Sequence, residues 1–309
     1  MDETLTPPEE QPQPPAPSTI HKIFLGPQGL RAGWSALIFV AVFAACATIV
    51  NLFMHFVVHH GQPHTHTPPT VHGMLIAEII SVIFVVIATW VMARIEKRPF
   101  SAYGLAGTRR APLFTTGLCW GFAFISLLVG SLYFTHHISF DPSHAALLPA
   151  LKYGAVWAII FILVGFFEEM LLRGYLLWTI WRGIGFWWAA VILSFTFGAL
   201  HGRNPEESPI GLVSAGAVGL VFCLSIWYTR SLWWAIGFHA AWNWGQTFFY
   251  GASDSGLPAK GSFFVTHPQG SLLMSGGATG PEGSLLILPI LLLISLVIYL
   301  TLRSHPTPG

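Results

Sequence analysis

The chain has 309 residues, of which 53% are hydrophobic and only 9% are charged, and its formal net charge is +1. Soluble domains carry about 25% charged residues, so this composition excludes an ordinary soluble protein and predicts a surface that mostly faces lipid. The sequence has no basic tract, which gives no reason to expect a nucleic acid partner. We therefore expect an integral membrane protein whose first partner is membrane lipid.

The two ends of the chain differ from its centre. Residues 1–20 are acidic and rich in proline, with few apolar side chains to bury, which predicts a disordered tail. With a short interfacial lead-in, this tail makes up residues 1–30, and residues 304–309 form a second tail. We expect one transmembrane bundle to fill residues 31–303.

Apolar segments recur between these ends. The hydrocarbon core of a bilayer is about 30 Å thick and requires about 20 apolar residues in a helix. Eight segments reach or approach this length, which predicts an all-α fold, a polytopic membrane helix bundle of about eight transmembrane helices. The expected spans are residues 35–58, 74–95, 113–135, 153–181, 186–201, 209–229, 231–250 and 284–302.

Lysine and arginine residues are distributed unevenly over the connections between the spans. With a cytoplasmic N-terminus, ten of the 14 lie on the cytoplasmic side, three lie outside and Arg173 lies within a span. An excess of positive charge marks cytoplasmic connections, so both termini are predicted to be cytoplasmic. The polar start without a sorting signal is typical of a bacterial inner membrane protein.

Three ionisable residues interrupt the fourth span, in the stretch FFEEMLLRGY. Each charge at the bilayer centre costs about 2.5 to 3.5 kcal/mol on insertion scales, so these groups must be paired or face a wet cavity. Glu169 and Arg173 are four residues apart, which predicts an ion pair on one helix face. Glu168 is turned by about 100°, onto the face of Leu172 and Tyr175, and has no cation at helical spacing. An unpaired carboxylate inside a membrane is a functional candidate.

Two further spans carry polar residues at the same four-residue spacing. The fifth span ends with Phe197 and His201, and the seventh contains His239 and Asn243. A single histidine in an apolar helix is more often a packed core residue than a functional one. Because such residues occur on three spans together with Glu168, we predict that they face one shared, open or conical cavity within the membrane.

This residue set is suited to hydrolysis. A carboxylate in a medium of low dielectric, with a histidine, can activate water as a general base, which would place Glu168 and His201 at the water. His239 and Asn243 could then donate hydrogen bonds to an oxyanion. The same types of residue also hold catalytic zinc, in which case Glu168, His201 and His239 would be the ligands. The residues alone do not choose between these two chemistries.

The three motifs together resemble a known family. EEMLLR at 168–173, FGALH at 197–201 and HAAWN at 239–243 resemble the EExxxR, FxxxH and HxxxN motifs of the CAAX protease and bacteriocin-processing family, also called the Abi family. Their order and their positions on the fourth, fifth and seventh spans are similar to those of type II CAAX prenyl endopeptidases. The resemblance covers residues 98–250.

The resemblance implies an intramembrane endopeptidase that acts on a peptide or protein substrate. It implies catalytic roles for Glu168, His201, His239 and Asn243, and supporting roles for Glu169, Arg173 and Phe197. It favours a site without a cofactor, with a divalent metal such as zinc as the alternative. The competing interpretations are a bacteriocin-immunity or scaffolding protein that kept the fold without catalysis, and a proton-coupled transporter.

Overall fold

Most of the predicted bundle is described by the computed structural model of the chain. The described residues are 23–26, 29–58, 70–142, 147–258 and 261–303. The predicted disordered tail at 1–20 and the tail at 304–309 lie outside these residues. The described part is thus the bundle and most of the connections between its spans.

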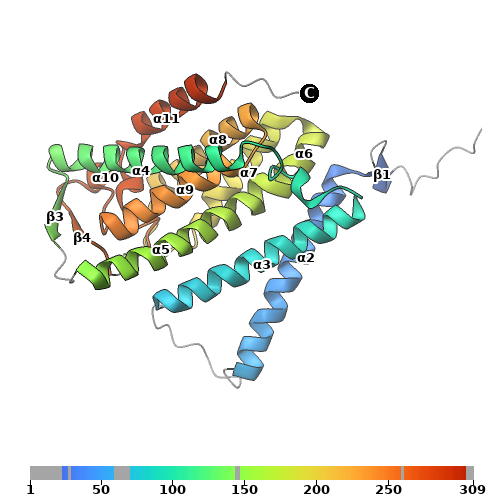
Figure 1. Cartoon of the computed structure of the whole chain (residues 1–309), viewed down its shortest axis with the longest axis horizontal. Helices are drawn as coiled ribbons and strands as arrows, with labels where there is room; N and C mark the ends of the chain where they lie inside the picture. The colour runs from blue at the N-terminus through green and yellow to red at the C-terminus, as the bar shows by residue number, and fades with distance from the viewer. Residues whose placement is uncertain (1–22, 27–28, 59–69, 143–146, 259–260, 304–309) are drawn as a thin grey trace, which may run out of the picture.

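The described residues form a helical membrane bundle, as predicted (Figure 1). Its helices are α2 (Ala32–Phe53), η1 (Met54–Val58), α3 (Val71–Ile95), η2 (Phe100–Ala102), α4 (Arg110–Phe134), α5 (Leu147–Glu168), η3 (Glu169–Leu176), α6 (Leu177–Ile184), α7 (Phe186–His201), α8 (Pro209–Thr229), α9 (Trp233–Trp244), η4 (Gly245–Phe249), α10 (Leu272–Ser275), η5 (Pro281–Gly283) and α11 (Ile287–Leu302). Five helical stretches in the described part are long and apolar enough to cross a membrane, and α7 and α11 are shorter apolar helices. The long fourth span combines α5, η3 and α6.

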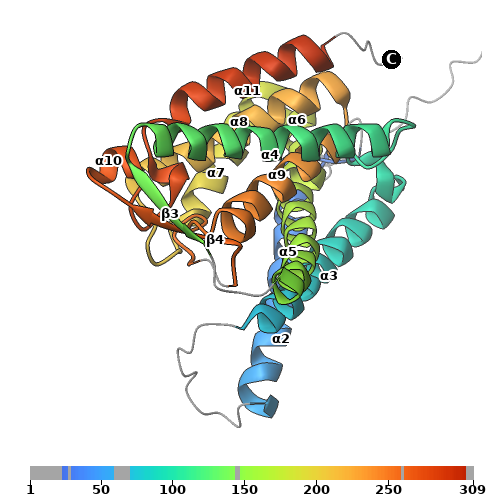
Figure 2. The same cartoon turned by 60° about the vertical axis from the view of Figure 1, so that its left-hand side comes forward.

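Two short antiparallel pairs of strands accompany the helices. β1 (Leu25–Gly26) pairs with β2 (Gly29–Leu30) just before α2. β3 (Ile138–Pro142) follows α4 and pairs with β4 (Phe264–Pro268), which follows η4 (Figure 2). The β3–β4 pairing places these two connections at the same end of the bundle, as the predicted alternation of spans requires.

The opposite end is held by contacts among three other connections. The backbone amide of Leu232, before α9, donates a hydrogen bond to the carbonyl oxygen of Gly104 over 2.9 Å. Arg182 Nη2, in α6, lies 2.9 Å from Glu96 Oε1, at the end of α3. These contacts join the connections that the sequence assigns to one side of the membrane.

Glycines allow α4 and α9 to pack backbone against backbone. A Cβ atom on Gly121 of α4 would collide with the carbonyl oxygen of Phe238, and one on Gly117 would collide with that of Trp234. A Cβ on Gly237 of α9 would in turn collide with the carbonyl oxygen of Phe114. Small residues at such contacts let membrane helices approach closely. The seam therefore determines where α9 lies relative to the rest of the bundle.

Candidate active site

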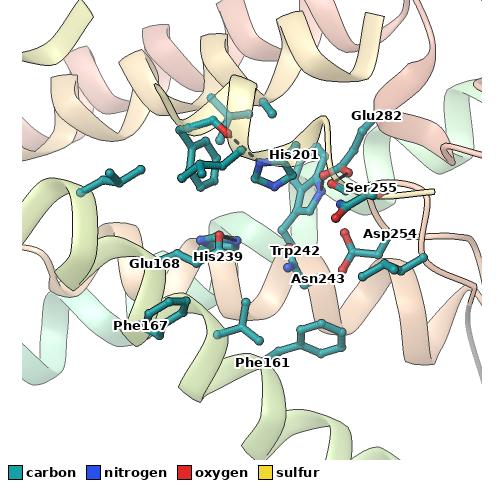
Figure 3. Close-up of a pocket in the computed structure, with 18 of the residues that line it drawn as sticks. Phe161, Phe167, Glu168, His201, His239, Trp242, Asn243, Asp254, Ser255 and Glu282 are labelled. Atoms are coloured by element: carbon teal, nitrogen blue, oxygen red, sulfur yellow. Dashed lines mark hydrogen bonds and ion pairs between the residues drawn. The ribbon is translucent and has the colours of Figure 1, made fainter. Parts of the chain in front are cut away.

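A cavity of about 410 Å³ lies within the bundle. Residues of α3, α5, α7, α8 and α9 line it, and part of the segment between η4 and α11 closes one side. The four predicted catalytic residues all line this cavity, although they come from three helices (Figure 3): Glu168, His201, His239 and Asn243. Helix packing thus brings together the residues that the motifs singled out.

The chain changes its helical winding at the first of these residues. The α-helix α5 ends at Glu168, and a π-helix follows in which Gly174 has non-helical dihedral angles, φ −77° and ψ −116°. Glu168 and Leu172, which the sequence placed on one face, both line the cavity. Tyr175 instead donates a hydrogen bond to Glu96 Oε1 over 2.7 Å, whereas Glu168 lines the cavity.

A buried charged cluster lies beneath Glu168. Glu169 Oε1 accepts hydrogen bonds from Arg173 Nη1 over 3.1 Å and from His239 Nδ1 over 3.2 Å, and the side chains of Glu169 and Arg173 are fully buried. The Arg173 guanidinium also lies 4.1 Å from the ring centre of Phe197. A Cβ on Gly219 would approach Arg173 Nη2 to 2.6 Å, so the small residue lets α8 pack closely against this cluster. The predicted ion pair is confirmed, and its histidine partner was not predicted.

The contact with Glu169 fixes the orientation of His239. A carboxylate paired with arginine can only accept hydrogen bonds, so His239 Nδ1 must carry the proton and donate it. His239 Nε2 then faces Glu168 Oε2 at 3.7 Å. Glu168 is 27% exposed, and its Oε2 atom has no hydrogen-bond partner among the described residues. Glu169 is therefore bound by Arg173 and His239, whereas Glu168 is available to a ligand in the cavity.

His201 is oriented by a bond within its own helix. Its Nδ1 donates to the backbone carbonyl oxygen of Phe197 over 2.8 Å, which leaves Nε2 free to accept a hydrogen bond. The Phe197 ring centre lies 4.6 Å from that of His201 and 6.3 Å from that of His239. Phe197 thus spaces the two imidazoles. His201 and Glu168 line the same cavity without a hydrogen bond between them.

Asn243 lies one helical turn after His239 on α9. Its side chain is buried, with 9% of the residue exposed, and it lines the cavity. No other described residue makes a hydrogen bond to it. The amide is therefore free to donate to an atom that enters the cavity.

Glu168, His201 and His239 are the metal ligands that the sequence offered as an alternative. Among the described residues, no group of three or more histidine, cysteine, aspartate or glutamate side chains is placed to hold a metal ion. Glu168, His201 and His239 therefore do not form a metal centre in this arrangement, and we derive no step through a metal.

A second group of residues lies at the cavity and was not predicted from the sequence. We call this group the wall: Asp254, Ser255 and Glu282 (Figure 3). Asp254 and Leu257 exchange backbone hydrogen bonds of 2.9 and 2.8 Å across a tight turn. Its central residues, Ser255 and Gly256, have φ of 46° and 78°, as type I′ turns require. This turn holds Asp254 and Ser255 against the cavity.

Glu282 completes the wall from a different part of the chain. It accepts hydrogen bonds from Trp242 Nε1 over 2.8 Å and from Ser255 Oγ over 2.9 Å. No periodic pattern marks these residues, which lie in the connection between η4 and α11. Glu78 of α3 also lines the cavity. Glu78 could have been found, because it is an acidic residue inside a predicted span.

Comparison with known proteins identifies one segment. Residues 150–245 match the family model described as Rce1-like, type II CAAX prenyl endopeptidase Rce1-like. The match runs from α5 to the first residue of η4 and contains all three motifs, so the expected resemblance is confirmed. No curated protein and no solved structure matches the chain.

Proposed function

From the resemblance of residues 150–245 to type II CAAX prenyl endopeptidases, we propose that this integral membrane protein is an intramembrane endopeptidase. The family match supports a membrane protease in general. The proposal that Glu168 is the catalytic base rests on the different surroundings of the adjacent residues Glu168 and Glu169. Glu169 is fully buried and bound by Arg173 and His239, whereas the Glu168 side chain is 27% exposed and lines the cavity.

Glu168 and His201 are proposed to activate the attacking water. Glu168 takes one proton of the water, and His201 Nε2 accepts a hydrogen bond from the other, which aims the oxygen at the peptide carbonyl. His201 can do this because its Nδ1 proton is committed to the Phe197 carbonyl. General base catalysis by a positioned carboxylate contributes about 10²- to 10⁴-fold.

Asn243 and His239 are proposed to stabilise the tetrahedral intermediate. The Asn243 amide donates to the oxyanion. His239 Nε2 lies 3.7 Å from Glu168 Oε2, so it can receive the proton taken from water, and Glu169 stabilises the resulting imidazolium. The protonated Nε2 donates to the oxyanion and then releases the proton to the leaving amine. Water and a peptide bond are thereby converted into a carboxylic acid and an amine.

The test is cleavage of membrane-tethered reporter peptides, prenylated and unprenylated, by purified protein in liposomes. Glu168→Gln is expected to lower kcat by about 10²-fold or more, since an amide cannot act as a base. Glu206→Gln is the matched control, because this carboxylate is exposed in the connection before α8. Equal turnover by the wild type and Glu168→Gln would refute the mechanism. The proposed route is metal-free, so chelation should leave kcat unchanged, and loss restored by zinc would contradict it.

We further propose a bacterial inner membrane location with both termini in the cytoplasm. The connections alternate between two ends, with the β3–β4 pair at one end and the Arg182–Glu96 pair at the other, which supports both termini on one side. The excess of lysine and arginine on that side supports the cytoplasm, and the polar start without a sorting signal supports a bacterial inner membrane. A fluorescent protein fused to the C-terminus should fold and fluoresce, and a periplasmic phosphatase fused there should be inactive. The reverse result would invert the proposed orientation.

A further inference from the structure

The charge of the cavity lining is one-sided. Four carboxylate side chains face this single space: Glu78, Glu168, Asp254 and Glu282. The described lining residues include no lysine and no arginine. A substrate segment that enters the cavity therefore meets carboxylate side chains, and it meets no lysine or arginine among the described lining residues.

The wall is built from carboxylates whose hydrogen bonds come from neutral donors. Glu282 is held by the Trp242 indole and the Ser255 hydroxyl. Asp254 Oδ2 accepts from Thr247 Oγ1 over 3.3 Å, and Asp254 is buried, with 9% of the residue exposed. Neutral donors orient a carboxylate without cancelling its charge. This contrasts with Glu169, whose charge is balanced by Arg173.

A second observation marks this part of the cavity as a place for a ligand. Asn243 is nine-tenths buried, lines the same space and has no hydrogen-bond partner among the described residues. The Asn243 amide therefore keeps its hydrogen-bonding capacity for a bound group or water in the cavity. Figure 3 shows it between His239 on one side and Asp254 on the other.

We propose that Asp254 and Glu282 bind the ammonium or guanidinium group of a lysine or arginine side chain in the substrate. This inference rests on the proposed endopeptidase function and names its substrate class. In this arrangement the scissile bond lies at Glu168, and the lysine or arginine side chain extends from it to Asp254 and Glu282.

The protonation of Asp254 agrees with this geometry. Burial, followed by the charge of Glu282, raises the pKa of Asp254 well above its usual range. Both effects oppose an ionised Asp254 in the empty site, and a bound cation offsets both. The wall is therefore poised to hold a positive group more firmly than a neutral one.

The experiment measures binding and cleavage separately, with three membrane-tethered peptides that carry Lys, Gln or Glu at a single position beyond the scissile bond. Binding is measured on the Glu168→Gln protein in nanodiscs, so that turnover does not interfere. The Lys peptide is expected to bind about tenfold more tightly than the Gln peptide, with the Glu peptide weakest. The isosteric changes Asp254→Asn and Glu282→Gln should remove most of this preference.

Glu206→Gln is the matched control, because this carboxylate is exposed in a neighbouring connection and does not line the cavity. It should keep the full preference for lysine. Equal binding of the three peptides would overturn the inference, even if all are cleaved. A lysine preference in binding that depends on Asp254 and Glu282 would support it even if no peptide is cleaved, and that result would contradict the proposed function alone.

Discussion

The cavity has two charged regions that were assembled in opposite ways. The first, which we call the floor, consists of Glu168, Glu169, Arg173 and His239 on helices within the membrane. The second is the wall of Asp254, Ser255 and Glu282, which comes from the connection between η4 and α11. In the floor the buried Arg173 balances the charge of the buried Glu169. In the wall, Asp254 and Glu282 each accept hydrogen bonds from neutral donors only.

This difference indicates a difference in task. A buried ion pair holds its members in one geometry, and removing either member destabilises the fold strongly because the other charge is left buried and unpaired. The wall carboxylates have neutral donors and no lysine or arginine beside them among the described lining residues, so a cationic ligand can still bind there. We therefore expect changes in the floor to affect folding and every substrate, and changes in the wall to affect the choice of substrate.

The largest effect is expected from Arg173→Met, which leaves the fully buried Glu169 carboxylate without its cation. Breaking a buried ion pair costs about 3 to 5 kcal/mol, so the midpoint of thermal unfolding should fall steeply. The measurement is thermal unfolding of the purified protein in detergent. Arg203→Met, at an exposed position after α7, is the control and should leave the midpoint unchanged. Equal midpoints for both variants would mean that the floor does not stabilise the bundle.

A smaller effect, confined to catalysis, is expected from Asn243→Ala. Loss of one oxyanion donor lowers kcat by about 10²- to 10³-fold. Because the amide has no partner among the described residues, its removal should leave the unfolding midpoint near that of the wild type. Steady-state kinetics on a reporter peptide measures both kcat and KM. A rise in KM with unchanged kcat would show that Asn243 binds the ground state and is not an oxyanion donor.

The smallest effect is expected from Asp254→Asn, which should raise the midpoint of thermal unfolding, whereas Arg173→Met should lower it. Because burial and Glu282 raise the pKa of Asp254, the folded protein holds a proton that the unfolded chain releases. Such a group lowers stability as pH rises above the pKa of the unfolded state. The variant should therefore unfold at a higher temperature than the wild type near about pH 7, with the gain shrinking towards about pH 4. A lower midpoint near neutrality would show that the wall stabilises the fold.

The two regions also differ in how far the sequence predicted them. The spans and the floor residues were accessible because charges in apolar helices violate the membrane pattern, and the Glu169–Arg173 pair followed from helical spacing alone. The bond from Glu169 to His239 was not accessible, since it depends on how α9 packs. The π-helix after Glu168 was also missed, because a change in winding leaves the hydrophobic pattern unaltered.

The wall could not be predicted for a different reason. Asp254 and Glu282 are 28 residues apart in a connection without periodicity, and each reaches the cavity through backbone turns that glycine makes possible. Gly256 has φ of 78° and Gly280 has φ of 100°. A glycine in a sequence permits such a turn but does not say which side chain the turn will present.

The glycine seam between α4 and α9 carries a consequence for random mutagenesis of this protein. None of the described residues that line the cavity belongs to α4. Any side chain larger than hydrogen at Gly117 or Gly121 would nevertheless push α9 outward, and His239 and Asn243 would move with it. Inactivating mutations should consequently accumulate on a helix that does not line the cavity. Smaller side chains on α9 should not restore activity, because the collisions are with its backbone.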